Sequence, residues 1–242
     1  GPTEVVIEDI TILYDSVYAE NIDTWFVYEI GQDTTFTYTC APFFGDCGDL
    51  VSYQGYDYAT VLIGDQCWFA ENLRSESYEN GDAITAGLNS SEWTSTTSGA
   101  TVIYDGNASN LEAYGRLYNW HAVDDARSLC PSTWRIPSDG DWTTLTNFLG
   151  GAAVAGGQMK TTYGWNGDGN GTNSSGFSGL PGGSFASNGN FNLGGSSGYW
   201  WSASPYGSSA WYRIVSYNDE AVTRNFAYQR NGYSVRCVRD AE

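Results

Sequence analysis

Short stretches of alternating apolar and polar residues, separated by glycine-rich turns, recur along this chain. They include TWFVYEI before residue 40, and YWWSAS, AWYRIVSY, AVTRNFAY and YSVRCVRD after residue 198. A period of two places side chains alternately on the two faces of a strand. Aromatic residues make up 16% of the chain and glycine supplies 30 residues, which is typical of short strands joined by tight turns. The pattern argues against a protein of long helices.

Acidic residues are concentrated in the first half of the chain. Residues 1–115 contain 19 of the 28 Asp and Glu residues and one basic residue, Arg74, so the net charge of −18 belongs to this half. Such a field repels phosphate backbones, which argues against nucleic acid as a partner. Solvation of the surface explains these carboxylates, and Ca²⁺ binding by some of them is the alternative.

Two segments predict helices. Residues 117–127 place Leu117, Trp120, His121 and Asp124 near one helical face, and Ser138 is a good N-cap for a second helix that ends before Gly150. Residues 1–45 predict a small N-terminal β appendage, and residues 46–242 the main domain. Within it, the polar segments 75–112 and 151–198 predict long ordered loops.

Cysteine usage indicates an oxidising compartment. The five cysteines include no CxxC pair of the zinc or redox kind, so disulfides are the better interpretation, and an odd count leaves one thiol over, with Cys40 the candidate. No run approaches the ~20 apolar residues that a membrane helix needs. We therefore expect an extracellular or bacterial cell-surface protein without a transmembrane segment.

Three segments together resemble one family. They are TVLIGDQCWFAENLR at 60–74, YGRLYNWHAVDDARSLCPSTWRIPSDGDWTTLTNFLGG at 114–151, and GWNGDGNGTNSSGFSGLPGG through YSVRCVRD at 164–240. Their order, spacing and turn residues are similar to those of the Fibrobacter succinogenes major paralogous domain, over about residues 47–240. That family is related to the C-type-lectin-like fold of formylglycine-generating enzymes. The resemblance implies an α+β fold, in which two helices pack on a twisted, loop-rich antiparallel β core whose ends lie close together.

The implied fold gives the cysteines roles. Cys130 precedes the second helix and Cys237 lies in the last strand, so the resemblance implies a bridge between them, worth about 4–5 kcal/mol in the chain-entropy model. Cys47 and Cys67 are the favoured second pair. A Cys40–Cys47 bridge remains the alternative, because the short spacer between them can close.

The resemblance does not carry catalysis over to this chain. Formylglycine-generating enzymes use two cysteines spaced C-x4-C near the C-terminus; Cys237 aligns with the second, but Gly232 occupies the first position. Without paired thiolates there is no soft metal site. His121 is the only histidine, and we interpret it as a packed or hydrogen-bonded structural residue. The sequence therefore predicts a protein that is not an enzyme.

One loop has the pattern of a calcium site. Asn166, Asp168 and Asn170 present oxygen side chains at every second position between glycines, which is how hard-cation loops gather ligands. The loop lacks the closing Glu of an EF-hand, and a glycine loop stabilised by Asx-turns is the alternative. Calcium is the one candidate cofactor. The sugar-binding tripeptides of calcium-dependent C-type lectins do not occur, so calcium-bridged sugar recognition is not implied.

Ten aromatic residues lie between residues 199 and 233, interleaved with Arg, Asn, Asp and Gln. Because only alternate residues of a strand face the core, some of them must lie at the surface. The core candidates are Trp200, Trp211, Val215, Val235 and Val238. Tyr and Trp beside polar groups are typical of paratopes and sugar-stacking surfaces, and in the lectin-like fold this region presents the ligand face. The predicted ligand-binding residues are Tyr206, Ser208, Tyr217, Asn218, Asp219, Asn225, Tyr228, Arg230 and Asn231.

These observations favour a non-catalytic binding module that recognises a glycan or a surface protein through this C-terminal surface. The alternative is a structural subunit of a bacterial surface layer or fibre, in which the same surface mediates self-association. A formylglycine-generating-like oxidase is the remote alternative, since its paired cysteine is absent.

Overall fold

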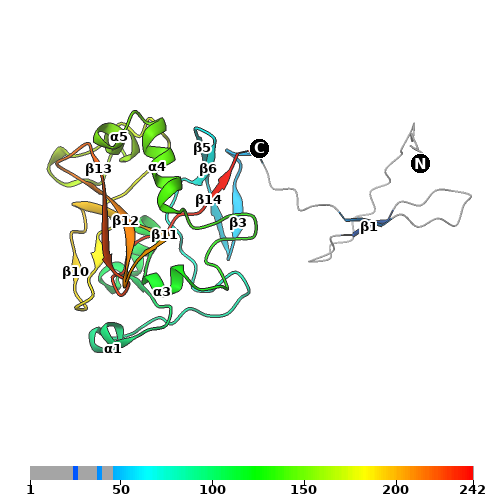
Figure 1. Cartoon of the computed structure of the whole chain (residues 1–242), viewed down its shortest axis with the longest axis horizontal. Helices are drawn as coiled ribbons and strands as arrows, with labels where there is room; N and C mark the ends of the chain where they lie inside the picture. The colour runs from blue at the N-terminus through cyan, green and yellow to red at the C-terminus, as the bar shows by residue number, and fades with distance from the viewer. Residues whose placement is uncertain (1–23, 27–36, 40–45, 242) are drawn as a thin grey trace, which may run out of the picture. The chain divides into compact units, whose positions relative to one another are not determined.

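The computed structural model describes residues 24–26, 37–39 and 46–241 (Figure 1). The chain divides into two compact units, residues 1–44 and 45–242. In the first unit, β1 (Thr24–Phe26) pairs antiparallel with β2 (Thr37–Thr39). The rest of the predicted β appendage, together with Cys40, lies outside the described residues.

The second unit is a mixed α+β domain, and all its named strand pairs are antiparallel. The described helices are α1 (Ser90–Ser95), η1 (Tyr104–Gly106), α2 (Ala108–Tyr114), α3 (Trp120–Val123), α4 (Asp139–Phe148), α5 (Ala152–Met159) and η2 (Asn166–Asp168). The strands are β3 (Val51–Tyr53), β4 (Tyr56–Tyr58), β5 (Thr60–Ile63), β6 (Gln66–Phe69), β7 (Thr101–Ile103), β8 (Arg116–Tyr118), β9 (Ser184–Phe185), β10 (Phe191–Asn192), β11 (Ser197–Tyr206), β12 (Ser209–Ser216), β13 (Val222–Tyr228) and β14 (Val238–Asp240). None of the described helices is both long enough and apolar enough to span a membrane.

The late strands predicted from alternation form a three-stranded antiparallel meander in the order β11-β12-β13. Its register places Trp200 opposite Arg213, and Arg213 opposite Arg224. An irregularity between Trp201 and Pro205 shifts the register of β11. The meander is the largest sheet of the domain, and the ligand-binding residues predicted from the sequence lie along it or in the turns at its ends.

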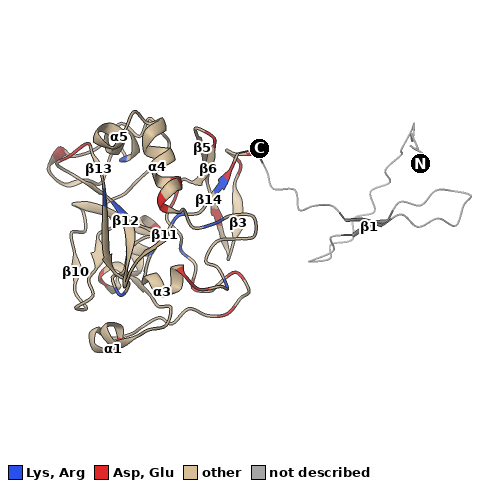
Figure 2. Ribbon diagram, viewed as in Figure 1, with Lys and Arg blue, Asp and Glu red and all other residues tan. Residues whose placement is uncertain are grey.

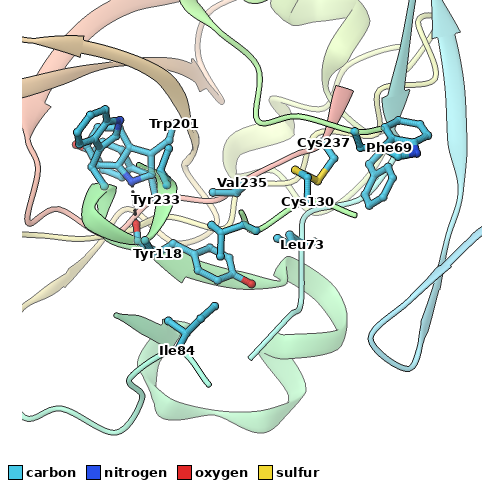
Figure 3. Close-up of a cluster of buried hydrophobic side chains, with 14 of the residues drawn as sticks. Phe69, Leu73, Ile84, Tyr118, Cys130, Trp201, Tyr233, Val235 and Cys237 are labelled. Atoms are coloured by element: carbon cyan, nitrogen blue, oxygen red, sulfur yellow. Dashed lines mark hydrogen bonds between the residues drawn. A yellow bond between two sulfur atoms is a disulfide. The ribbon is translucent and has the colours of Figure 1, made fainter. Parts of the chain in front are cut away.

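A second sheet joins the two ends of the domain. Its order is β14-β6-β5, with Val238 opposite Trp68, so the last strand pairs with one of the first. Both predicted disulfides are present: Cys47 bonds Cys67, and Cys130 bonds Cys237. The alternative Cys40–Cys47 bridge is therefore wrong. Figure 3 shows the second disulfide in the interior beside Phe69 and Leu73.

The meander is buried on both faces at its centre, which corrects one expectation about the core. Trp200, Val215, Val235 and Val238 are buried as predicted. Trp211 is only half-buried, although it lies on the same face as Trp200 and Val215. The hydrophobic core against α4 and α5 includes Trp200 and Val215 and ends before Trp211. On the opposite face, aromatic residues expected at the surface belong to the other main cluster instead: Tyr199, Trp201, Tyr212 and Tyr233.

The helices differ from the two that the sequence predicts. The second predicted helix is α4: Ser138 accepts a hydrogen bond from the Asp141 backbone nitrogen, and the Asp141 side chain accepts one from the Ser138 backbone. The first is wrong for most of residues 117–127, because Tyr118 pairs in β8 and Asn119 caps α3, which lasts only one turn. In the described domain three further α-helices, α1, α2 and α5, lie in segments expected to be loops.

Helix α5 explains why a glycine-rich segment is helical here. A Cβ atom on Gly156 would lie 2.7 Å from the carbonyl oxygen of Glu220 and 2.8 Å from that of Ala221. The helix packs directly on the backbone of the β12–β13 turn, an approach that only glycine permits. Glycine lowers the helix propensity of α5, but it allows the close contact between α5 and the β12–β13 turn.

Candidate functional site

The predicted ligand-binding residues lie at two opposite ends of the meander. Tyr206 pairs with Ser209, and Ser209 pairs with Tyr228. The predicted residues around 206–208 and those around 225–231 therefore lie at one end of the sheet, which we call the near end. Tyr217, Asn218 and Asp219 follow β12 at its other end. Seven residue steps of about 3.3 Å separate these ends, roughly 23 Å. One ligand contact therefore cannot include both groups unless the ligand is long.

The predicted residues in the β12–β13 turn, at the far end of the sheet, are in contact with other parts of the domain. A Cβ on Gly167 would lie 3.1 Å from the ring of Tyr217, and one on Gly169 would overlap the Tyr217 backbone. The Asp219 side chain accepts a hydrogen bond from the Ala221 nitrogen at 2.9 Å, and its backbone carbonyl accepts one from Lys160 at 2.9 Å. These contacts fold the β12–β13 turn onto its neighbours.

The predicted calcium loop lies beside that turn, and two of its three side chains are engaged with protein atoms. Asn166 donates to the Ser196 hydroxyl at 3.1 Å, and Asn170 accepts from the Trp165 nitrogen at 3.1 Å. The described residues contain no group of three or more His, Cys, Asp or Glu side chains that could hold a metal. Calcium binding by this loop stays a prediction.

The near end carries an aromatic patch, which we define as Tyr206, Trp211 and Phe226. The ring centroid of Tyr206 lies 4.6 Å from that of Trp211 and 4.6 Å from that of Phe226. Tyr206 and Phe226 are each 48% exposed. Strand alternation places all three on one face, and places Asn225 on the other. The patch begins where the core against α4 and α5 ends.

Charged groups hold the base of the aromatic patch in place. The guanidinium carbon of Arg224 lies 3.3 Å from the ring centroid of Trp211. Asp139, the first residue of α4, accepts hydrogen bonds from Arg224 at 2.9 Å and from buried Arg213 at 2.8 Å. Burial raises the pKa of Asp139, but the hydrogen bonds from the two arginines outweigh it and lower that pKa below its ordinary value. The ion pairs of Asp139 with Arg213 and Arg224 therefore hold the Arg224 side chain in position against Trp211. Figure 2 shows basic residues, which are arginines, on strands of the meander, while Asp and Glu lie mostly in turns and at helix ends.

At the same end of the meander lies a hollow of about 300 Å³, which we call the polar hollow. It is lined by residues 95–97 at the end of α1, by His121 of α3, by Ser208 in the β11–β12 turn, and by residues 228–230 at the end of β13. Three predicted ligand-binding residues thus meet here: Ser208, Tyr228 and Arg230. Tyr228 is 64% exposed, on the same face as Phe226. Hydroxyl groups, an amide, an imidazole and a guanidinium converge on this space.

Helix α1 positions one wall of the polar hollow. Asn89 and Glu92 form a capping box at its start, and buried Trp93 donates its indole N–H to the Arg230 carbonyl at 2.6 Å. The Arg230 guanidinium donates to the Thr94 carbonyl. Asn231 accepts from the Ser187 nitrogen at 2.6 Å and donates to the Tyr233 hydroxyl. Asn231 therefore fixes the chain behind the hollow.

His121 separates the polar hollow from a second one. The acidic hollow, of about 560 Å³, is lined by Tyr78, Asp124, Asp125 and Arg127, and shares His121 and Thr97 with the first. Burial, followed by the charge of Arg230, lowers the pKa of His121, while Asp124 raises it. The sequence suggests a packed or hydrogen-bonded structural histidine; His121 is half-buried, and no described residue forms a hydrogen bond with its ring. The ring instead lines both hollows.

Sequence reasoning misses several residues of this site. It places Trp211 in the core, selects neither Phe226 nor Arg224, and treats residues 95–97 as part of a loop. Two signals in the sequence could have corrected these predictions. Asn89 followed by Glu92 is a capping-box pattern that marks α1. Consecutive turns of a meander lie at opposite ends, so the order of the strands along the chain already separates Tyr217 from Tyr206.

The position of the enzyme-like cysteine pair is filled by packing. Cys237 is fully buried and bonded to Cys130, so it presents no thiol. A Cβ on Gly232 would lie 3.0 Å from Cβ of Phe185 and 3.2 Å from the ring of Trp93. A larger side chain at residue 232 would therefore have to displace the cluster that supports α1.

The comparison with protein families gives one result. Residues 61–239 match the Fibrobacter succinogenes major domain. No curated protein and no solved structure gives a match to the chain. The matched region spans most of the chain and includes the meander, nearly all of the β14-β6-β5 sheet, the disulfide between Cys130 and Cys237, and the aromatic patch. The chain therefore belongs to the Fibrobacter succinogenes major domain family.

Proposed function

We propose that this domain is a non-catalytic, extracellular binding module that recognises a glycan through the aromatic patch and the polar hollow. The observation that carries the proposal is the position of three partly exposed, mutually packed rings beside a hollow lined with hydroxyl, amide and guanidinium groups. A sugar ring has an apolar C–H face and a polar edge, so it needs an aromatic surface and hydrogen-bonding groups next to each other.

The arrangement of the rings supports binding with little conformational cost. Trp211 is held by Arg224 on one side and by Tyr206 and Phe226 on the others. Its strand is paired on both edges, by β11 and by β13. Rigid aromatic groups lose little side-chain entropy on binding. Exposed apolar patches rimmed by polar groups are typical of interaction sites on soluble domains.

The proposed location and fold detail rest on related arguments. Two disulfides in the described domain support an oxidising, extracellular compartment. The pairing of β14 with β6, and the late strands that present the aromatic patch, support the lectin-like fold that the family resemblance implies. We propose the bacterial cell surface as the place of action.

The contents of the polar hollow favour binding over catalysis. Its lining includes no carboxylate and no cysteine among the described residues. His121, the only histidine of the chain, has no hydrogen bond to a described carboxylate to orient its ring, as a general base would need. Self-association through the patch is the second candidate, favoured by the exposure of Phe226 on the edge strand β13.

A glycan array with matched variants tests the proposal. Trp211→Ala removes the central ring of the aromatic patch. Tyr163→Ala is the control: it removes a tyrosine that is 65% exposed, as Tyr228 is at 64%, from a loop outside both hollows. We expect Trp211→Ala to weaken glycan binding at least tenfold, about 1.4 kcal/mol, and Tyr163→Ala to leave it unchanged. Equal binding by both variants contradicts the proposal. Sedimentation of the wild type as a concentration-dependent oligomer that Trp211→Ala converts to monomer would favour self-association instead.

A further inference from the structure

Arg230 differs from the arginines of the domain that form ion pairs. Six arginines form ion pairs with carboxylates: Arg74, Arg116, Arg127, Arg135, Arg213 and Arg224. Arg230 is exposed at the polar hollow and, among the residues that the structure describes, forms no ion pair. Its guanidinium has five N–H donors, of which one bonds the Thr94 carbonyl. Most of its donors therefore remain available to a ligand.

The polar hollow is locally positive in a chain of net charge −18. Arg230 is the one permanently charged group in its described lining, and protonation of His121 would add a second positive charge. At physiological ionic strength, charges more than ~8 Å apart are largely screened, so Arg230 dominates over most carboxylates of the chain; Asp124 and Asp125, across the acidic hollow, are the nearest exceptions. The hollow therefore attracts an anion although the chain as a whole is acidic.

Hydroxyl groups line the hollow beside Arg230. Those of Ser95 and Thr96 donate to backbone carbonyls, whereas the hydroxyl groups of Thr97 and Ser208 have no hydrogen-bond partner among the described residues. The backbone on which Arg230 stands is fixed twice, by the Trp93 bond to its carbonyl and by the bond from the Trp120 nitrogen to the Gln229 carbonyl at 2.8 Å. A planar guanidinium on a fixed backbone suits bidentate binding of a carboxylate or sulfate.

We propose that the polar hollow binds the carboxylate or sulfate group of an anionic saccharide, with Arg230 as the principal contact, while an adjoining sugar ring stacks on the aromatic patch. This inference rests on the proposed glycan-binding function and names the class of glycan. The two surfaces share one end of the meander, because Tyr228 lines the hollow and lies on the same strand face as Phe226. The proposed ligand is therefore a saccharide of a few rings that contacts both surfaces.

His121 provides a second readout of the same site. The groups that face it are Arg230 across the polar hollow, and Asp124, Asp125 and Arg127 across the acidic hollow. Burial and the charge of Arg230 lower the pKa of His121 and so disfavour its protonated form. A bound anion would offset the charge of Arg230 and favour the protonated imidazole, so affinity for the anion rises as the pH falls through the His121 pKa.

Calorimetric titration with charged and neutral saccharide pairs tests the inference. The probes are a galacturonic acid hexamer and its methyl ester, and a sulfated galactan oligosaccharide and its desulfated form. We expect the wild type to bind at least one charged probe at least tenfold more tightly than its neutral partner. Arg230→Gln should abolish that difference, whereas Arg135→Gln, which removes the same charge from a site outside both hollows, should preserve it. His121→Gln should abolish the rise in affinity at lower pH without abolishing binding.

The remaining outcomes distinguish failure of the anionic-saccharide inference from failure of the glycan-binding proposal. Equal affinity for the charged and neutral members of both pairs, or a preference that Arg230→Gln leaves intact, overturns the anionic-saccharide inference. If Trp211→Ala still abolishes binding of the neutral probes in that case, the glycan-binding function stands. Failure of every saccharide, on the array and in titration, overturns both. A thermal unfolding midpoint of Arg230→Gln close to that of the wild type ensures that lost affinity does not reflect lost folding.

Discussion

Two adjacent glycines in α5 allow a matched test of how this helix packs. Both lie inside the helix, so replacing either with alanine gains about 0.8–1.0 kcal/mol of helix propensity. The surroundings of the added methyl group differ. On Gly156 it would lie 2.7 and 2.8 Å from two backbone carbonyl oxygens of the β12–β13 turn. On Gly157 its nearest neighbours are side-chain atoms of Glu220 at 3.5 Å, an ordinary contact distance.

The two variants should therefore shift stability in opposite directions. Gly157→Ala should stabilise the domain by about 0.5–1 kcal/mol. Gly156→Ala forces the helix away from the turn, and overpacking of this kind costs about 1–3 kcal/mol or more, which exceeds the gain in propensity. For a domain of this size, 1 kcal/mol corresponds to about 2–4 °C in the unfolding midpoint.

Thermal unfolding followed by circular dichroism, with urea unfolding as a second measure, compares the two proteins under identical conditions. We expect the midpoint of Gly157→Ala to lie above the wild type and that of Gly156→Ala below it. Stabilisation of similar size by both substitutions would refute the close approach of α5 to the turn. It would also remove the reason given above for a glycine-rich helix at this position.

Two further predictions concern the core and its ionic support. Replacing Cys130 and Cys237 together with serine opens a loop with a sequence separation of 107 residues and should cost about 4–5 kcal/mol, measured as a lower urea midpoint; an unchanged midpoint contradicts it. Asp139→Asn leaves buried Arg213 without its charged partner and should cost about 2–3 kcal/mol at neutral pH. Because the folded-state pKa of Asp139 is lowered, this difference should be complete above the unfolded-state pKa and vanish as the pH falls through the folded-state pKa. A difference that persists in strong acid would show that its charge is not responsible.

Local signals are sufficient for part of the fold. Ser138 and Gly150 mark the ends of α4 because capping depends on the residues next to the helix. The late strands follow from alternation for the same reason. Helix α5 cannot be found this way, because Gly156 has meaning only through its contact with the β12–β13 turn. The helix predicted over 117–127 is too long because the pairing of Tyr118 in β8 is a tertiary event.

The candidate site shows a similar division. Alternation correctly groups Trp200, Trp211 and Val215 on one face, but it cannot say how far α4 and α5 cover that face. Trp211 is partly exposed because this cover ends, and the length of the cover depends on how the helices sit on the sheet. The mixture of aromatic and polar residues in the late strands is enough to select Arg230 as a ligand-binding candidate. Its lack of an ion pair in the described structure, and the hollow that it shares with His121, depend on the positions of α1 and α3.

The two disulfides also determine how the domain carries mechanical load. Tension applied across residues 46 and 241 passes from Cys47 to Cys67, along the backbone to Cys130, and through the second bond to Cys237. Residues 131–236 are bypassed by that path. The bypassed segment contains α4, α5 and the whole meander with the aromatic patch and Arg230. The segment that presents the aromatic patch and Arg230 therefore stays outside the load path, while the backbone between Cys67 and Cys130 bears the force.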